Sequence, residues 1–291
     1  NKISKFNPML TNRFFQIIIS LSMSLWFTSC STGYYLVNYP DFANDVFYRK
    51  VVKAEKKLDG NDAILYLDAT KLRTQFTYAF MVEKADRIIE SDYESGKDLY
   101  LKAVESFELA ISHGKTSLQL RHPQLQNMMD WITEDVTFTE YDVPYLYWLG
   151  ASYGGAIGSS RGKAKWVIQL PIVGYLLEKA LVIDPAWNFG AIHSALISYS
   201  MARTDLLGNN VENAKIHYKQ AMLFSSNQDA GAKVSFAENV LVFIQEKDKF
   251  VTLLNEVLAM DLEKNKELSL GNMIARKRTL WLLSKTDELF Y

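Results

Sequence analysis

A short pattern of three residues recurs four times along this chain and constrains its fold more than any other feature. In each copy a small or apolar residue is followed by a bulky one four positions later, and by another small or apolar one three positions after that. Spacings of four and three place the three side chains on one face of an α-helix. Small residues there let a neighbouring helix approach closely, while the bulky residue fills the gap. The copies are Ala103-Phe107-Ala110, Val173-Leu177-Ala180, Ala214-Tyr218-Ala221 and, less closely, Phe250-Leu254-Val257.

A further helical segment precedes each copy, so the pattern predicts four helix–turn–helix units. The chain has only six prolines, and alternating strand patterns are nearly absent. We therefore predict an all-α fold, an irregular α-solenoid of about four hairpins closed by a C-terminal capping helix at about 270–289. The preceding segments are residues 69–91, 144–157, 188–203 and 230–246.

The second unit resembles a tetratricopeptide repeat (TPR). The run from Ala180 to Pro185 has the spacing that ends a standard repeat, and Trp148-Leu149-Gly150 is similar to the start of its first helix. The small residues of successive units, Ala180 and Ala221, lie 41 positions apart, whereas the standard period is about 34. The array is therefore predicted to have longer loops than a standard TPR array.

The first thirty residues have the pattern of a bacterial export signal. A basic stretch (residues 1–13) precedes an apolar run (14–27), which is too short and too broken by serine for a membrane helix of about 20 apolar residues. Two small residues, Thr28 and Ser29, then precede Cys30. Small residues before a cysteine let a lipoprotein signal peptidase reach the bond.

This junction resembles a bacterial lipobox, with Phe27 where leucine is usual. The resemblance implies cleavage before Cys30 and acylation of that cysteine, palmitate included. The expected organisation is a signal peptide (1–29), a lipidated tether and lead-in (30–62) and a TPR-like helical domain (63–291). An uncleaved signal anchor is the alternative reading.

Composition narrows the possible partners and chemistry. The chain has 32 basic and 33 acidic residues, and 29 basic against 33 acidic once the signal is removed. No strongly basic field remains to attract nucleic acid. Cys30 is the single cysteine, so no internal disulfide can form. Since no further segment has the pattern of a membrane span, we expect membrane attachment through the lipid anchor only.

Two short motifs imitate catalytic or nucleotide-binding sites. Residues 150–154 (GASYG) fit the G-x-S-x-G elbow of serine hydrolases, with Ser152 as nucleophile, but the surrounding sheet that an elbow needs has no counterpart in the pattern. The acid and base that would follow in chain order are Asp184 or Asp205, and His193 or His217. Residues 158–164 (GSSRGKA) are one residue short of a phosphate-binding loop and end in alanine where serine or threonine is required. The simpler interpretation of residues 150–154 is a close helix crossing, and that of residues 158–164 is a basic inter-helix loop.

The four histidines do not form a metal-binding motif. None pairs with another at ligand spacing on one helix, and no H-E-x-x-H sequence occurs. We expect neither a metal nor another cofactor.

Aromatic residues indicate a function more clearly than these motifs or the histidines do. They make up 13% of the chain, and stacked hairpins present a concave surface or channel lined mainly by their first helices. Aromatic side chains there would favour an apolar or amphipathic guest or a partner protein. The candidates for a ligand channel are Tyr147, Tyr153, Trp187, Phe189 and Tyr199.

Taken together, these features resemble the TatT family, the T component of TPR-protein-associated TRAP transporters. The matching segments are TSC at 28–30, WLGASYGGAI at 148–157, LLEKALVIDPAWNFGAIHSAL at 176–196, FVTLLNEVLAMD at 250–261 and WLLSKTDELF at 281–290.

The resemblance implies a non-enzymatic, periplasm-facing envelope lipoprotein that docks the solute-binding protein (P component) of the transporter. It also implies a channel for a hydrophobic or amphipathic ligand and assembly as a homo-trimer. Ser31 after Cys30 gives no strong retention signal, which favours the outer membrane. The alternatives are a generic TPR scaffold in envelope assembly and the serine hydrolase using Ser152.

Overall fold

The computed structural model describes residues 39–125, 136–203 and 209–291. Four of its helices begin directly after a residue whose side chain caps the first turn. The carboxylates of Asp62, Asp92 and Asp229 and the amide of Asn265 each accept a hydrogen bond, of 2.9–3.1 Å, from a backbone N–H in the first turn that follows. Such caps satisfy donors that a helix leaves free at its start. Residues 44–291 form one compact unit. The predicted signal peptide and Cys30 lie outside the described residues.

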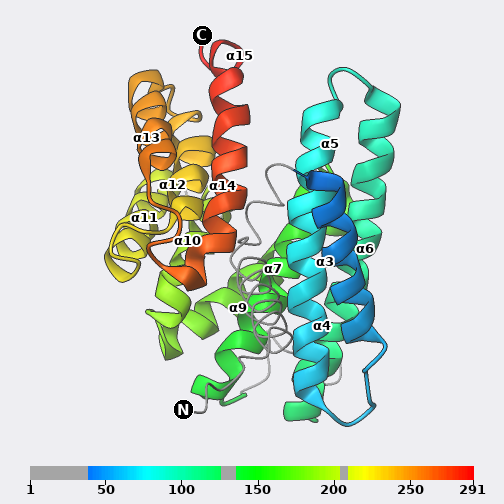
Figure 1. Cartoon of the computed structure of the whole chain (residues 1–291). Helices are drawn as coiled ribbons and strands as arrows, with labels where there is room; N and C mark the ends of the chain where they lie inside the picture. Colours follow the sequence, from blue (N-terminus) through cyan, green and yellow to red (C-terminus); the bar gives the residue numbers. More distant parts are fainter. Residues whose placement is uncertain (1–38, 126–135, 204–208) are drawn as a thin grey trace, which may run out of the picture. The chain divides into compact units, whose positions relative to one another are not determined.

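The described chain is all-α, as predicted, and contains no strand in the ranges above. Figure 1 shows the order of its elements along the chain. The elements are α3 (Pro40–Glu55), α4 (Ala63–Phe76), the π-helix η1 (Thr77–Val82), α5 (Glu83–Ile88), α6 (Tyr93–Arg121), the 3₁₀ turn η3 (Glu140–Asp142), α7 (Val143–Ser159), α8 (Ala164–Val167), α9 (Leu170–Ile183), α10 (Trp187–Ala202), α11 (Asn210–Phe224), α12 (Ala230–Phe236), the π-helix η4 (Ala237–Leu241), α13 (Lys247–Ala259), α14 (Lys266–Ser284) and α15 (Thr286–Leu289).

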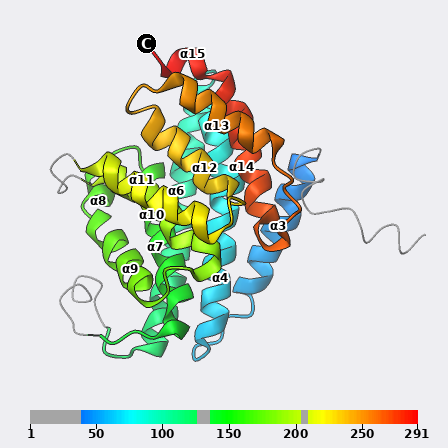
Figure 2. The same cartoon turned by 90° about the vertical axis from the view of Figure 1, so that its left-hand side faces the viewer.

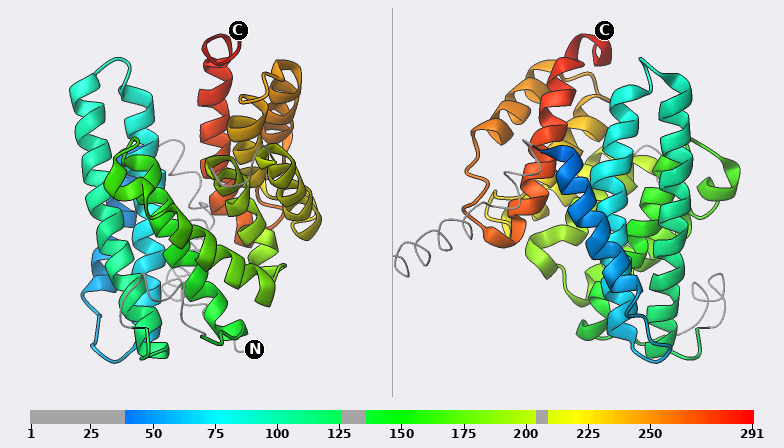
Figure 3. Two further views of the ribbon diagram at one scale, coloured as in Figure 1. Left: turned by 180° about the vertical axis from the view of Figure 1, so that it is seen from behind. Right: turned by 45° about the vertical axis from the view of Figure 1, so that its right-hand side comes forward.

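The helices pair as four successive hairpins. The continuous α4–η1–α5 segment packs on α6, α7 packs on α9, α10 on α11, and α12–η4 on α13. Figure 2 shows α11 lying along α10. The helix α14 then packs against α12 and α13 at the C-terminal end (Figure 3). The predicted helical-repeat array and its capping helix are therefore confirmed.

The repeated triplets lie in the interior of the array. Every member of the first, second and fourth triplets is at most 4% exposed, and in the third only Tyr218 is half-buried. Burying such side chains contributes about 1.5–3 kcal/mol for each large apolar residue. The triplet faces therefore contribute to the hydrophobic core of the array.

Two hydrophobic clusters divide the interior, and α10 contributes to both. The first cluster joins α6, α7, α9 and α10, with Phe107, Leu149 and Leu177 among its members. The second joins α11–α14 with η4 and is centred on Phe250 and Leu254. Because α10 supplies residues to each, it couples the two halves of the array.

Small residues set the spacing between helices, as the sequence predicts. Gly174 of α9 faces the hydroxyl of Tyr199, and a Cβ built on Gly174 would lie only 1.8 Å from that oxygen. Gly155 of α7 lies against the ring of Phe107, with a corresponding distance of 2.4 Å. No other residue fits these two positions without displacement of an aromatic ring.

The lead-in expected over residues 30–62 contains a helix, α3, which its sequence pattern does not predict. Glu55 near the end of α3 accepts hydrogen bonds from Arg73 of α4 and His113 of α6. Burial alone would raise the pKa of Glu55, but the hydrogen bonds from His113 and Arg73 outweigh it and lower the pKa to about 2. An ion pair therefore ties α3 to the first hairpin.

One segment that the sequence analysis does not single out has the length and hydropathy of a membrane span. It runs from Ala164 to Ile183, across α8 and α9. Its residues Ile172, Val173, Leu176 and Leu177 are buried in the first hydrophobic cluster. The apolar character of α9 is therefore accounted for by its place in the core of the second hairpin.

Candidate functional site

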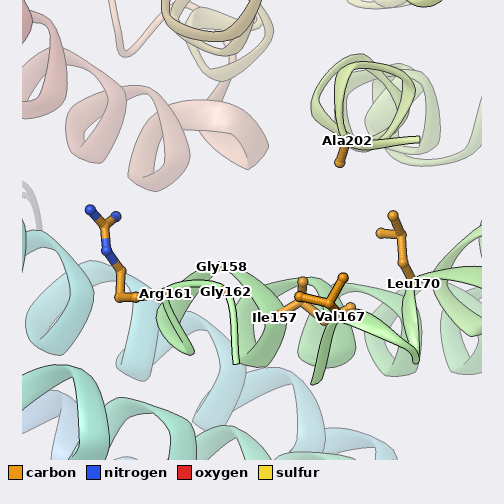
Figure 4. A pocket seen from close by; sticks show the side chains of 7 residues that line it. All are labelled: Ile157, Gly158, Arg161, Gly162, Val167, Leu170 and Ala202. Atoms are coloured by element: carbon orange, nitrogen blue, oxygen red, sulfur yellow. The ribbon is translucent and has the colours of Figure 1, made fainter. Parts of the chain in front are cut away.

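A pocket of about 470 Å³ opens where the second hairpin turns and meets the third. The end of α7, the turn after it, α8, the start of α9 and the end of α10 each supply part of the wall (Figure 4). The lining residues are Ile157, Gly158, Arg161, Gly162, Val167, Leu170 and Ala202. This volume lies within the range, about 300–1,000 Å³, of sites for small organic ligands.

The wall of the pocket is apolar apart from one charge. Ile157, Val167 and Leu170 project from one side and Ala202 from α10 opposite, while the side chain of Arg161 extends beyond them (Figure 4). Arg161 is the single ionisable side chain among the lining residues that the structure describes. The pocket therefore combines a hydrophobic wall with a cationic end.

The turn that carries Arg161 has a left-handed backbone. The φ angles of Arg161 and Gly162 are 53° and 84°. Glycine adopts this region freely, whereas a residue with a Cβ is strained there. The turn ends α7 and directs the arginine away from the helix, so that its guanidinium lies 5.1 Å from the ring centre of Tyr100.

Tyr100 connects the pocket to a largely buried ion cluster, which we define as Glu83, Asp86, Glu238 and Arg278. The Tyr100 hydroxyl donates a hydrogen bond to Asp86, which also accepts one from Arg278. Arg278 reaches Glu83 at 3.4 Å and donates two hydrogen bonds to Glu238.

The ion cluster joins the first hairpin to the last. Glu83 and Asp86 belong to α5, directly after the π-helix η1, whereas Glu238 lies in the π-helix η4 and Arg278 in α14. The ring of Trp281, one turn after Arg278, lies 4.2 Å from its guanidinium. π-Helical segments often occur at functional sites.

Burial perturbs the ionisable groups of this region. It raises the pKa of Glu83 despite the nearby charges of Arg278 and Arg87. Burial alone would lower the pKa of Arg278, but the hydrogen bond and charge of Glu238 raise it instead. Arg278 therefore stays charged and holds three carboxylates in place.

The predicted channel aromatics occupy different environments. Tyr147 and Trp187 are half-buried and their ring centres lie 4.8 Å apart. Tyr153 and Tyr199 are 3% and 9% exposed and belong to the first hydrophobic cluster. Phe189 is half-buried and has a left-handed backbone, with φ of 59°. None of the five lines the pocket described above, and their role in a channel stays a prediction.

Ser152 does not form a nucleophile elbow. It lies in the middle of α7, fully buried, and its hydroxyl bonds the Trp148 carbonyl oxygen at 2.8 Å and the Thr74 hydroxyl at 2.6 Å. The elbow hypothesis for Ser152 is therefore wrong, because the motif is a helix-crossing surface without the required turn.

The acids and bases proposed for that triad serve other contacts. Asp184 accepts a hydrogen bond from the backbone of Ala186, and Asp205 lies outside the described residues. His193 and His217 bond each other, with their Nδ1 atoms 2.9 Å apart. Burial, and then the proximity of His193, lowers the pKa of His217 to about 4. At neutral pH both rings are therefore uncharged.

Sequence reasoning missed the most distinctive part of this site. Residues 158–164 are interpreted above as a basic inter-helix loop, which they are, but that loop supplies Arg161 to the pocket. The two glycines Gly158 and Gly162 are the available signal, because glycine marks turns and loops. Among the described residues, no group of three or more His, Cys, Asp or Glu side chains is placed to hold a metal ion.

Two comparisons with known proteins bear on this arrangement. A family model described as TAtT, TRAP transporter T-component, matches residues 47–290, which span all four hairpins and α14. The chain is also similar to an uncharacterized protein of Treponema pallidum (strain Nichols). The two are 21% identical over 232 residues, 78% of this chain and 72% of the relative.

Proposed function

The chain belongs to the T-component family of TRAP transporters, and from that membership we propose that it is a lipid-anchored envelope protein that docks the solute-binding protein of its transporter. It is a component of a transport system, and in this proposal it catalyses no reaction. The observation that carries the proposal is the family match across the complete hairpin array.

Hairpin arrays suit docking because their stacked helices present a continuous, preformed surface. The proposed anchor at Cys30 would hold this surface near the membrane and raise its local concentration relative to the transporter. A raised local concentration strengthens weak docking without new contacts. Since one acyl chain gives only marginal membrane binding, we propose multiple acylation. The outer membrane is our preferred location.

The pocket supports passive handling of a solute. Its apolar wall suits a hydrophobic or amphipathic guest in passage between the solute-binding protein and the transporter. Half-buried Tyr147 and Trp187 are our candidates for a continuation of that path. We also propose a homo-trimer, which sedimentation of the mature protein would measure directly.

The proposal is tested by affinity capture of the full chain from its own envelope after mild chemical cross-linking. We expect the solute-binding protein of a TRAP transporter to be recovered from the wild type and to be depleted from a Cys30→Ala variant, which cannot be lipidated. Recovery of envelope-assembly proteins alone would favour the generic TPR scaffold and contradict the proposal.

A further inference from the structure

The helix α3 and the turn after it carry a concentrated positive charge. Five cations follow one another at spacings of one, three, three and one, which place them on one side of a helix. We call them the basic face, and all are exposed: Arg49, Lys50, Lys53, Lys56 and Lys57. Although α3 ends at Glu55, the N–H of Lys56 donates to the Val52 carbonyl oxygen at 3.0 Å, so the helical course continues.

The opposite side of α3 packs on the first hairpin, which leaves the basic face turned outward. Val51 and Phe47 are 1% and 7% exposed, and the ring centre of Phe47 lies 5.4 Å from that of Phe80 in η1. Glu55 is the single acid within residues 46–58. Its carboxylate accepts hydrogen bonds from Arg73 and His113, so it is engaged on the inner side and does not neutralise the lysines.

The five cations have no carboxylate partner among the residues that the structure describes. Several exposed lysines elsewhere do form ion pairs, at 2.7–2.9 Å: Lys102 with Asp98, Lys165 with Glu108, Lys247 with Asp287 and Lys249 with Glu246. Neighbouring like charges on a helix repel one another. The basic face is therefore suited to an extended anionic surface, which would relieve this repulsion.

The position of the basic face along the chain indicates its partner. Pro40, the first residue of α3, follows Cys30 by ten positions. An extended chain spans at most about 3.6 Å per residue, so α3 begins within about 36 Å of the proposed lipid anchor. We propose that the basic face binds the anionic phospholipid headgroups of the membrane that holds the anchor. The inference rests on the proposed function, because it takes Cys30 as the point of attachment.

This second contact would orient the array at the membrane. A lipid anchor limits the distance of the protein from the bilayer but leaves it free to rotate, whereas a basic face on α3 turns the first hairpin toward the headgroups. An acyl chain combined with a polybasic patch is an effective pair of membrane-binding signals. The composition of the whole chain conceals the patch and predicts attachment through the anchor only, because acidic residues elsewhere balance these charges.

An acidic partner protein would match the same charge, but the anchor favours the bilayer. Anionic headgroups within reach of a short tether are present at a high effective concentration, which strengthens a weak contact. Electrostatic attraction decays over about 10 Å at moderate salt, so the contact requires the close approach that the tether allows.

Binding of the mature chain to lipid vesicles tests the basic face without its anchor. The parent protein is the mature chain with Cys30→Ala, which cannot be acylated. Vesicles of phosphatidylcholine and phosphatidylglycerol in equal parts provide an anionic surface, and vesicles of phosphatidylcholine alone a neutral one. We expect flotation with the anionic vesicles only, and its loss when added salt screens the charges.

Matched triple variants locate the contact on α3. Each basic residue near an anionic surface strengthens binding about fivefold, so Lys53→Gln, Lys56→Gln and Lys57→Gln together should weaken it about 100-fold. The corresponding three changes to arginine should retain binding. A control triple at exposed positions on other elements, Lys163→Gln, Lys179→Gln and Lys219→Gln, removes the same charge and should leave binding unchanged. Far-ultraviolet circular dichroism establishes that each variant is folded.

Two results would overturn the proposal: equal binding of the parent to neutral and anionic vesicles, and equal losses in the two glutamine triples. A parent that binds no vesicles, with the α3 triple losing capture of the solute-binding protein, would assign the face to an acidic partner and also overturn it.

The anchor is scored separately by palmitate labelling. Vesicle binding that depends on the α3 lysines, without label at Cys30, would refute only the anchor. Label at Cys30 without vesicle binding would refute only the basic-face contact.

Discussion

Adding one methyl group to α7 should have opposite effects at two adjacent positions, Gly154 and Gly155. At Gly154 a Cβ would meet no atom within 4 Å, whereas at Gly155 it would lie 2.4 Å from two carbons of the Phe107 ring. Ordinary contacts begin near 3.4 Å, so the ring or the helix must move by about 1 Å. Phe107 is 1% exposed and is surrounded by the first hydrophobic cluster, so it has little room to move.

The expected change in the free energy of unfolding follows from two opposing effects. Both Gly154→Ala and Gly155→Ala gain about 1 kcal/mol of helix propensity. Only Gly155→Ala also suffers overpacking, typically about 1–3 kcal/mol. The difference in free energy of unfolding between the two variants isolates the overpacking, so Gly154→Ala should be the more stable by about 1–3 kcal/mol.

Urea denaturation followed by circular dichroism measures this difference, provided that the denaturant slope stays constant. The double variant Phe107→Leu with Gly155→Ala should be more stable than the two single changes predict, by about 0.5–3 kcal/mol. A Gly155→Ala protein as stable as Gly154→Ala would refute the reasoning that the small residues of α7 set the distance between hairpins.

Further variants test the ion pairs and the anchor. Arg278→Met should lower the free energy of unfolding by about 3–5 kcal/mol in thermal or urea melts, because three carboxylates lose their shared cation; an unchanged melt would contradict this. The folded pKa of Glu55 is about 2 against an ordinary 4.5, so its ion pair stabilises the fold above about pH 4.5. This contribution, about 1–3 kcal/mol once solvent screening is included, is lost as the pH falls toward 2. Urea melts across this range should show a flatter pH dependence for Glu55→Gln than for the wild type, and parallel curves would refute the assignment. Cells given radiolabelled palmitate should label the wild type and Ser31→Ala but not Cys30→Ala, and label on the last would disprove lipidation at that cysteine.

Local periodicity accounts for the parts of the fold that the sequence predicts. The triplet Phe250-Leu254-Val257 needs only a helix to place its three side chains on one face, and all three are fully buried. The four hairpins and α14 follow from such short-range patterns. The helix α3 is not predicted from local sequence, because it is held by Glu55, whose partners Arg73 and His113 lie 18 and 58 residues away.

The site depends on contacts that periodicity does not encode. Arg278 meets Glu83 across 195 residues of chain, and nothing near either residue in the sequence indicates the other. Arg161 becomes part of a pocket only because α10 brings Ala202 opposite α8 and α9. A high aromatic content does not distinguish Tyr153, in the core, from half-buried Tyr147.

The central claim is that this hairpin array docks a solute-binding protein. Sedimentation velocity of the purified mature chain mixed with the solute-binding protein of its own transporter tests it most directly. The account predicts a faster-sedimenting complex that contains both proteins and whose population rises with concentration. Independent sedimentation of the two proteins at every concentration would contradict it.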